Sequence, residues 1–524
     1  MKKKGIILAA FFATIMLSSL GASVFLKNTP TQSGNADITA TGTPADHFPD
    51  AQRIKFCGSG DAKSTPFVKE YRIPTECTNP LAIVADYDGN VWFAQTNTGK
   101  LAKFDPKAES FTEFDNKLWP KNGRSMIWGI DYSPDGSLWY TDESYDSIWR
   151  FSTQDQKYQR IAYPSEGDSL PQKLKVDGSQ IVINDFTGNK ITFLDPTQTN
   201  DNLRYLNLPS PVNGSVTGAF AIDNNKNVWY TNWLFQQGGV LVKFDQEGYR
   251  NSVANVDDKS LPSLDYIQVF QLPSELLTPN GMAISDGMIW LADTSSSAIF
   301  SFDPNTQQFT QYITSDPKLS TYGNSTGVIK SPISRPYWIE SNSDGNLVFN
   351  EQTANSIAVM NPKSESLVEY LIPSKNPSWS DCDVDSNCGL AQIFDFTIHG
   401  DKVWFTEWVE NNIGVVDTSV ALPFGIELDS KDISLSPGES KTMSFTISPQ
   451  QDLSGVSLIL SDPHTFLNLS SSVSAPFQLN SGAKSVDVTI SASDDAIPGK
   501  YKILLGAQIE DVSISKFVTV TILP

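Results

Sequence analysis

The middle of the chain repeats one short pattern, an apolar strand that ends in a single polar residue. Apolar residues fill successive positions of this strand, so both of its faces are predicted to be buried. A turn residue stands seven positions before each polar end, and in all units but the fourth a second turn follows ten positions after it. The strands are VWFAQ (91–95), LWYTD (138–142), IVIND (181–185), VWYTN (228–232), IWLAD (289–293), LVFNE (347–351) and VWFTE (403–407). Such fixed spacings predict a repeat architecture.

The repeat unit has four strands, which are joined by an Asp-Gly-type turn, a loop and an Asp-Pro turn. Four-stranded sheets buried on both faces pack around an axis, which predicts a seven-bladed β-propeller over residues 67–423. The seventh repeat lacks its fourth strand, whereas VKEYRIPT (68–75) matches VEYLIPS (368–374), the fourth strand of the sixth repeat. We therefore predict that the N-terminal strand, residues 67–74, completes the last blade and closes the ring.

Residues 424–524 follow a different pattern, in which apolar and polar residues alternate, as in KTMSFTIS, SVDVTISA and SKFVTVTI. Alternation of this kind indicates strands with one buried face. About seven such strands in about 100 residues are typical of an immunoglobulin-like β-sandwich. The predicted fold class is therefore all-β, a seven-bladed β-propeller followed by an immunoglobulin-like β-sandwich.

Charge and the N-terminal segment bear on where the protein acts. The chain has 38 Lys and Arg against 59 Asp and Glu, a net charge of −21, which excludes nucleic-acid binding. Three lysines precede an uncharged stretch over residues 5–26, so residues 1–27 are predicted to be a signal peptide or a membrane anchor. Residues 28–66 have the composition of a flexible tether. Either alternative places the protein outside the cell or on the surface of a prokaryote.

The chain has four cysteines, Cys57, Cys77, Cys382 and Cys388. In an exported protein these predict two disulfides, for which three pairings exist. We favour Cys57–Cys77 and Cys382–Cys388.

The segments NPLAIVADYDGNVWFAQTNTGKLAKFD (79–105) and VWFTEWVENNIGVVD (403–417) resemble blades of the virginiamycin B lyase family and, more broadly, NHL and gluconolactonase-like propellers. The resemblance implies a Mg²⁺-dependent elimination that opens a cyclic ester. In that family a catalytic His stands fourteen residues before a Glu that binds the metal together with a residue two positions before the His. Here Glu351 and Glu407 occupy the Glu position, Tyr337 replaces the His before Glu351, and Arg335 occupies the further metal position.

The polar ends of the repeated strands share one face of the predicted propeller, and five of them are carboxylates. Converging carboxylates can recruit a hard cation, which predicts a Mg²⁺ or Ca²⁺ site at the channel mouth. The alternative is that each side chain caps the turn that follows it. The candidate ligands are Asp142, Asp185, Asp293, Glu351 and Glu407. The candidate contacts of a bound ligand are Trp233, Trp408, Asn79 and Asn280.

A second candidate cation site lies in the loop DCDVDSNC, where Asp381, Asp383, Asp385 and Asn387 alternate. Alternating oxygen ligands begin many Ca²⁺ loops. An acidic, solvated loop closed by Cys382–Cys388 is the alternative interpretation.

Two functional hypotheses follow. In the first, the chain is a monomeric, noncatalytic recognition or scaffold module that binds a small molecule, a glycan or a surface protein at the top face of the propeller. In the second, it is a metal-dependent lyase or hydrolase of cyclic esters or lactones. Glu351 and Glu407 would then serve catalysis, Arg335 would stabilise an oxyanion and Tyr337 would transfer a proton.

Overall fold

The computed structural model describes residues 57–524 except 59, 122, 165–168, 199–203, 235–237, 254–263, 318–332, 378–387 and 463. The predicted signal or anchor segment, most of the predicted tether, and the acidic loop residues Asp381, Asp383, Asp385 and Asn387 lie outside the described residues. Within the described ranges, no helix is long and apolar enough to span a membrane.

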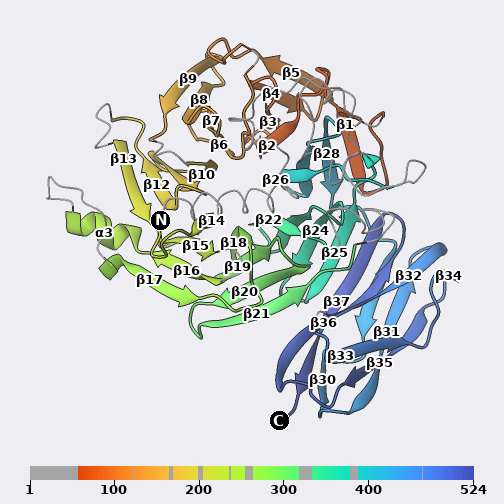
Figure 1. Ribbon diagram of the computed structural model, residues 1–524. Coiled ribbons are helices and arrows are strands. Elements are labelled where there is room, and N and C mark those ends of the chain that lie inside the picture. The colour runs from red at the N-terminus through yellow and green to blue at the C-terminus, as the bar shows by residue number, and fades with distance from the viewer. Residues whose placement is uncertain are drawn as a thin grey trace, which may run out of the picture.

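The described residues form seven blades of four antiparallel strands each, arranged around a central axis (Figure 1), which confirms the predicted propeller. The first five blades are separate sheets of four consecutive strands each. They are β2 (Pro80–Ala85), β3 (Val91–Gln95), β4 (Lys100–Asp105) and β5 (Ser110–Phe114); β6 (Ile130–Tyr132), β7 (Ser137–Asp142), β8 (Ser147–Ser152) and β9 (Lys157–Ala162); β10 (Pro171–Asp177), β11 (Gln180–Asp185), β12 (Lys190–Leu194) and β13 (Tyr205–Pro209); β14 (Val216–Ile222), β15 (Val228–Leu234), β16 (Gly238–Phe244) and β17 (Ile267–Gln271); and β18 (Pro279–Ser285), β19 (Met288–Asp293), β20 (Ala298–Asp303) and β21 (Gln308–Ile313). Two short helices, α3 (Gln246–Val253) and η4 (Leu264–Tyr266), connect β16 to β17.

The last blade is built from both ends of the propeller. Its strands are β26 (Ile393–His399), β27 (Lys402–Glu407) and β28 (Asn412–Asp417), and β1 (Val68–Arg72) is the fourth. β1 pairs antiparallel with β28, with Val68 opposite Val416 and Arg72 opposite Asn412. Cys57 and Cys77 form a disulfide on either side of β1, with 5.4 Å between their Cα atoms. Cys388 is also disulfide-bonded, whereas Cys382 lies outside the described residues.

The second strand of each blade is buried almost throughout, as its unbroken apolar pattern predicts; all five residues of β3 are buried, for example. The first strand of each blade lies nearest the axis (Figure 1). In six of the seven blades its pairing with the second strand is irregular near its first residues, as between Pro80 and Ile83. Such bulges redirect side chains, and here they lie where the innermost strands begin.

The sixth blade differs because its sheet continues into the C-terminal part of the chain. Its strands are β22 (Pro336–Ser341), β23 (Leu347–Glu351), β24 (Ser356–Asn361) and β25 (Ser366–Leu371). β25 pairs antiparallel with β37 (Val512–Ile522), which continues through β36 (Gly499–Gln508) and β32 (Leu453–Ser461) to β34 (Phe477–Leu479). β30 (Asp432–Leu435) pairs parallel with β37, so the sheet has nine strands in the described part of the chain. The rim edge of the sixth blade is therefore covered.

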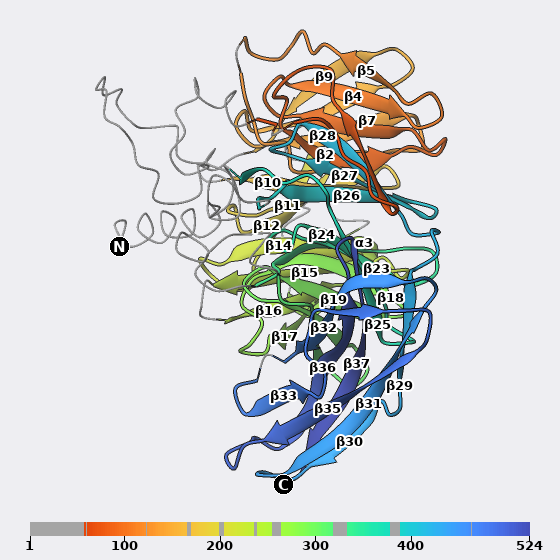
Figure 2. The same cartoon turned by 90° about the vertical axis from the view of Figure 1, so that its right-hand side faces the viewer.

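A second C-terminal sheet contains β29 (Phe424–Leu428), β31 (Ser440–Pro449), β35 (Lys484–Ala492) and β33 (Leu467–Ser471). Buried residues of this sheet, such as Phe445 and Val488, belong to the same hydrophobic core as Ile503 and Val518 of the nine-stranded sheet. Both C-terminal sheets extend from the rim of the propeller beside β25 (Figures 1 and 2). The C-terminal part is thus joined to the propeller by backbone pairing as well as by the chain itself.

Candidate functional site at the mouth of the propeller

The seven polar strand ends all lie on one face, and all seven side chains are fully buried. Asp142 accepts hydrogen bonds from the backbone N–H of Tyr145 at 3.2 Å and from the indole of Trp149 at 2.8 Å. Asp293 accepts from the backbone N–H groups of Thr278 at 2.8 Å and Ser295 at 3.1 Å. These contacts are those of a turn cap, since they satisfy backbone groups of the neighbouring turns.

Asp185 is held in the same way. It accepts from the backbone N–H groups of Gly188 at 2.9 Å and Leu170 at 2.8 Å, and its other oxygen accepts from the hydroxyl of Tyr163 at 3.1 Å. Among the residues that the structure describes, no three His, Cys, Asp or Glu side chains lie close enough together to hold a metal ion.

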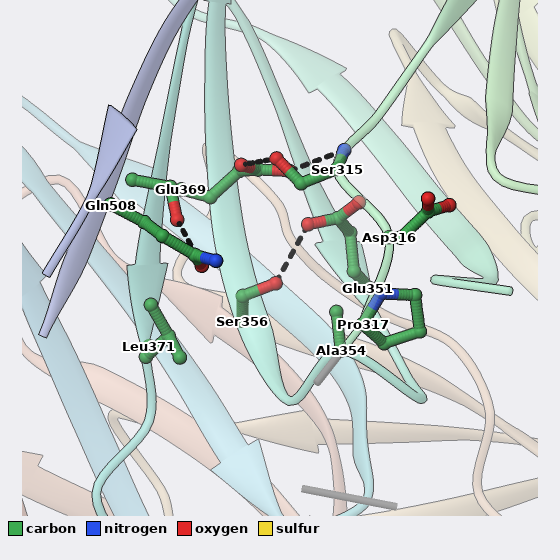
Figure 3. A pocket seen from close by; sticks show the side chains of 10 residues that line it. Ser315, Asp316, Pro317, Glu351, Ala354, Ser356, Glu369, Leu371 and Gln508 are labelled. Atoms are coloured by element: carbon green, nitrogen blue, oxygen red, sulfur yellow. Dashed lines mark hydrogen bonds between the residues drawn. The ribbon is translucent and has the colours of Figure 1, made fainter. Parts of the chain in front are cut away.

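Glu351 belongs to a carboxyl pair inside the sixth blade (Figure 3). One of its oxygens accepts a hydrogen bond from Ser356 Oγ at 2.7 Å, and the other, Oε1, has no hydrogen-bond partner. Glu369 on β25 lies on the same small pocket and accepts from the backbone N–H of Ser315 at 3.0 Å and from its hydroxyl. Ala358 stands opposite Glu369 on β24.

Burial and mutual repulsion change the ionisation of this pair. Burial, and then the charge of Glu351, raise the pKa of Glu369 to about 8. Burial also raises the pKa of Glu351. Two buried carboxyl groups without a cation between them cannot both ionise at low cost, so the pair holds a proton at neutral pH.

The seventh blade repeats this arrangement. Glu407 accepts from Asn412 Nδ2 at 2.9 Å and leaves its Oε1 without a hydrogen-bond partner. Glu70 on β1 takes the place of Glu369 and accepts from the backbone N–H of Ser374 at 2.9 Å and from its hydroxyl at 2.6 Å. Burial, followed by the charge of Glu70, raises the pKa of Glu407 well above its ordinary value.

The first blade has Gln95 where the sixth has Glu351. Gln95 Nε2 donates a hydrogen bond to Glu113 Oε1 at 2.8 Å. The amide N–H thus takes the place of the proton that two carboxyl groups must share in the sixth and seventh blades. Each of the two predicted catalytic carboxylates has a second carboxyl group beside it, Glu369 beside Glu351 and Glu70 beside Glu407, and neither partner was predicted from the sequence. The spacing of eighteen residues, which Gln95–Glu113 and Glu351–Glu369 share, is the sequence signal that could have found them.

A cluster of aromatic side chains lies at the mouth, where the innermost strands begin. Phe394 lies at its centre, with ring centroids 5.9 Å from Trp128, 6.3 Å from Tyr337 and 5.6 Å from Trp408. All four are buried among the described residues. We call Trp128, Tyr337, Phe394 and Trp408 the mouth cluster. Trp233, the other predicted ligand contact, is 1% exposed and packs on Phe186 in a separate cluster.

Tyr337, the residue predicted to transfer a proton, is buried in this cluster. Its hydroxyl accepts a hydrogen bond from Gln172 Nε2 at 3.2 Å. Burial, and then the charge of Asp395, raise the pKa of Tyr337 well above its ordinary value, so the phenol stays protonated.

Arg335 precedes β22 and is a half-buried cation. Its backbone has a left-handed conformation with φ of 60°, which a non-glycine residue rarely adopts. Burial lowers its pKa to about 10, so the guanidinium remains charged at neutral pH. Its Nε is buried without a hydrogen-bond partner.

Asn79 and Asn280, the two asparagines predicted to contact a ligand, differ in whether their side-chain amide atoms are already hydrogen-bonded within the protein. Asn79 is engaged on both sides, because its Nδ2 donates to the carbonyl of Trp408 at 2.8 Å and its Oδ1 accepts from Asn97. Asn280 donates through Nδ2 to Thr294 Oγ1 at 2.9 Å, whereas its Oδ1 has no hydrogen-bond partner.

Below the mouth, an ion pair crosses the axis. Lys173 Nζ of β10 lies 2.5 Å from Asp395 Oδ1 of β26 and 4.1 Å from the ring centre of Trp338 on β22. Asp395 Oδ2 also accepts from the backbone N–H of Ile83 on β2 at 3.1 Å. Both charged side chains are buried. Their contacts join the innermost strands of four blades, β10, β26, β22 and β2. This pair was not predicted from the sequence, where its one signal is a lysine in an innermost strand.

No family model matches this chain, and no curated protein matches it. Among solved structures, a streptogramin B lyase matches with a TM-score of 0.50 and 18% identity, over 67% of this chain and 96% of that one. Virginiamycin B lyase from Staphylococcus aureus matches with a TM-score of 0.50 and 18% identity, over 68% of this chain and 99% of that one. The fold is that of the virginiamycin B lyase propellers. At this identity the likeness shows the fold alone, which confirms the resemblance stated from the sequence as a resemblance of fold.

Proposed function

We propose that the chain is an extracytoplasmic recognition module that binds a small molecule, a glycan or a surface protein at the mouth of its propeller. The observation that carries the proposal is the mouth cluster, in which aromatic rings from three blades meet where the innermost strands begin. Aromatic residues dominate the energetics of recognition sites. The lysine-flanked apolar segment of residues 5–26 supports export, either as a cleaved signal or as an anchor.

The residues at the lyase positions favour recognition over catalysis. Tyr337 stands where the resemblance implies a catalytic His, and its protonated, buried phenol is a poor base. Arg335 stands at a position where the resemblance implies a metal ligand, and a guanidinium has no lone pair to donate to a cation.

We further propose that residues 424–524 are an immunoglobulin-like sandwich that serves as a spacer or adhesion module. The two C-terminal sheets share one core and alternate buried with less buried residues, as in β35. Such modules commonly present a neighbouring domain at a surface, which suits a tethered propeller.

The recognition proposal is tested by screening the full chain against glycans, small acids and aromatic ligands by thermal melting, followed by calorimetry. Tyr337→Ala is expected to abolish binding of any ligand found. Tyr132→Ala is the matched control, because Tyr132 ends an innermost strand at the other face and is half-buried. If Tyr132→Ala abolished binding while Tyr337→Ala kept it, the ligand would lie on the opposite face and the proposal would be wrong.

The alternative function, a Mg²⁺-dependent lyase or hydrolase of cyclic esters, rests on the shared fold. It is tested by incubating the full chain with virginiamycin B and MgCl₂ and following the antibiotic by chromatography and mass spectrometry. Elimination would open the ring at unchanged mass, and hydrolysis would add one water. We expect neither product, and turnover that depended on Glu351 would establish the alternative.

A further inference from the structure

Three polar side chains at the junction of the fifth and sixth blades have buried atoms without hydrogen-bond partners. They are Arg335 through Nε, Gln352 through both Oε1 and Nε2, and Asn280 through Oδ1. Gln352 is 3% exposed and Asn280 is 4% exposed. A buried polar atom without a partner costs free energy, so three such residues in one place call for an explanation.

Backbone contacts bring these residues together. The carbonyl of Arg335 accepts from the backbone N–H of Gln352 at 3.1 Å. Thr294 Oγ1 accepts from Asn280 Nδ2 at 2.9 Å and donates to the carbonyl of Pro336 at 3.2 Å. Asn280 is therefore one hydroxyl group away from the residue that follows Arg335.

Arg335 carries the only formal charge of the three. None of the ion pairs found among the described residues includes it, although acidic residues exceed basic residues by 21 in the chain. The left-handed backbone does not explain the choice of arginine, because Asn79 and Gln392 adopt it at the corresponding places in other blades. A half-buried guanidinium without a carboxylate is expected where an anion from outside the chain supplies the missing charge.

We propose that Arg335, Gln352 and Asn280 bind the carboxylate end of a small ligand at the mouth of the propeller. The planar guanidinium presents paired N–H donors that match a carboxylate, and Gln352 Nε2 adds a further donor. Asn280 Oδ1 is an acceptor, so it selects a ligand with a hydroxyl or amino group near its carboxylate. This chemistry belongs both to free hydroxy or amino acids and to uronic acid residues of a glycan.

The proposal rests on the recognition function and names the ligand class for it. The lyase resemblance implies a bound cation at the position of Arg335, whereas the proposal places a bound anion there.

The first test needs no ligand. Arg335→Gln removes the charge and keeps a polar side chain, so the ligand-free full chain is expected to melt at a higher temperature than the unchanged protein. Arg150→Gln is the matched control, because Arg150 is paired with Asp135 at 2.8 Å and removing it is expected to leave the melting temperature unchanged or lower it. A lower melting temperature for Arg335→Gln would mean that the guanidinium already has a structural partner, and the proposal would fail.

The second test measures binding by calorimetry with glucuronate, an oligoglucuronate, lactate and neutral glucose as probes. A carboxylate probe is expected to bind, and Arg335→Gln is expected to lose at least tenfold in affinity while Arg150→Gln keeps it. Preference for the oligoglucuronate identifies a glycan, and preference for lactate identifies a free acid. If Arg335→Gln and Arg150→Gln bound neutral glucose with equal affinity and no carboxylate probe bound more tightly, the recognition function would stand and the carboxylate site would be overturned. Absence of binding for every carboxylate probe would overturn the carboxylate site, and the recognition function would then be judged by the wider ligand screen.

Discussion

The carboxyl pair of the sixth blade makes the stability of the protein depend on pH, and one substitution tests this. Glu351→Gln replaces the carboxyl group by an amide of nearly the same shape. The first blade already uses this arrangement, in which Gln95 donates to Glu113 at 2.8 Å. We therefore expect Gln at position 351 to donate to Glu369, so that Glu369 can ionise without the charge of residue 351 beside it, although Asp316 still lines the same pocket.

The size of the effect follows from the pKa of Glu369, which burial and the charge of Glu351 raise from 4.5 to about 8. One pKa unit corresponds to about 1.4 kcal/mol, so the whole rise corresponds to about 5 kcal/mol. The folded state holds this proton more tightly than the unfolded chain. The contribution to stability is therefore fully present below pH 4.5 and is lost as the pH rises to about 8, by about 1.4 kcal/mol per pH unit.

The assay is urea unfolding of the full chain between pH 5.5 and 8.5, followed by tryptophan fluorescence. The midpoint is expected to fall with pH in the unchanged protein and to fall less steeply in Glu351→Gln, which becomes the more stable protein near pH 8. Glu427→Gln on the exposed side of β29 is the control for the chemical change itself. Equal pH slopes for Glu351→Gln and the unchanged protein would refute the shared proton. Stabilisation by Mg²⁺ or Ca²⁺ that disappears in Glu351→Gln would show that Glu351 is ionised and binds the cation predicted from the sequence.

Three further predictions concern how the fold is held together. Ending the chain at residue 423 removes β37 from the edge of β25 and removes Phe517, whose ring centroid lies 5.1 Å from that of Tyr312. The exposed strand edge is expected to make the shortened protein aggregate, as measured by size-exclusion chromatography with light scattering. A monodisperse product would show that the propeller folds independently of the C-terminal sheets. Lys173→Met leaves Asp395 buried without its cation and is expected to cost about 3–5 kcal/mol in urea unfolding, which Lys173→Met with Asp395→Asn should largely restore. Cys57→Ser with Cys77→Ser opens a link of sequence separation 20 and is expected to lower stability by about 3 kcal/mol; an unchanged melting curve would contradict this.

The sequence predicted the propeller because its information is local. The second strand of each blade is buried on both faces, and an unbroken run of apolar residues in each of the seven repeats indicates that burial. The fit of residues 68–75 to the fourth strand of the sixth repeat pointed to the last blade for the same reason, since strands in equivalent environments have similar patterns.

The tertiary structure alone decided how the polar groups are paired. The sequence placed the strand ends on one face, but backbone N–H groups of the turns direct Asp142, Asp185 and Asp293 into hydrogen bonds within the protein. Lys173 and Asp395 meet only because the ring closes, as they are 222 residues apart. The pairing of β25 with β37 and the lack of a partner for the Nε of Arg335 are likewise properties of the assembled fold. The burial of a strand can be predicted from the residues next to one another in it. The partner of a charged side chain depends instead on which distant strands lie beside it once the ring is closed.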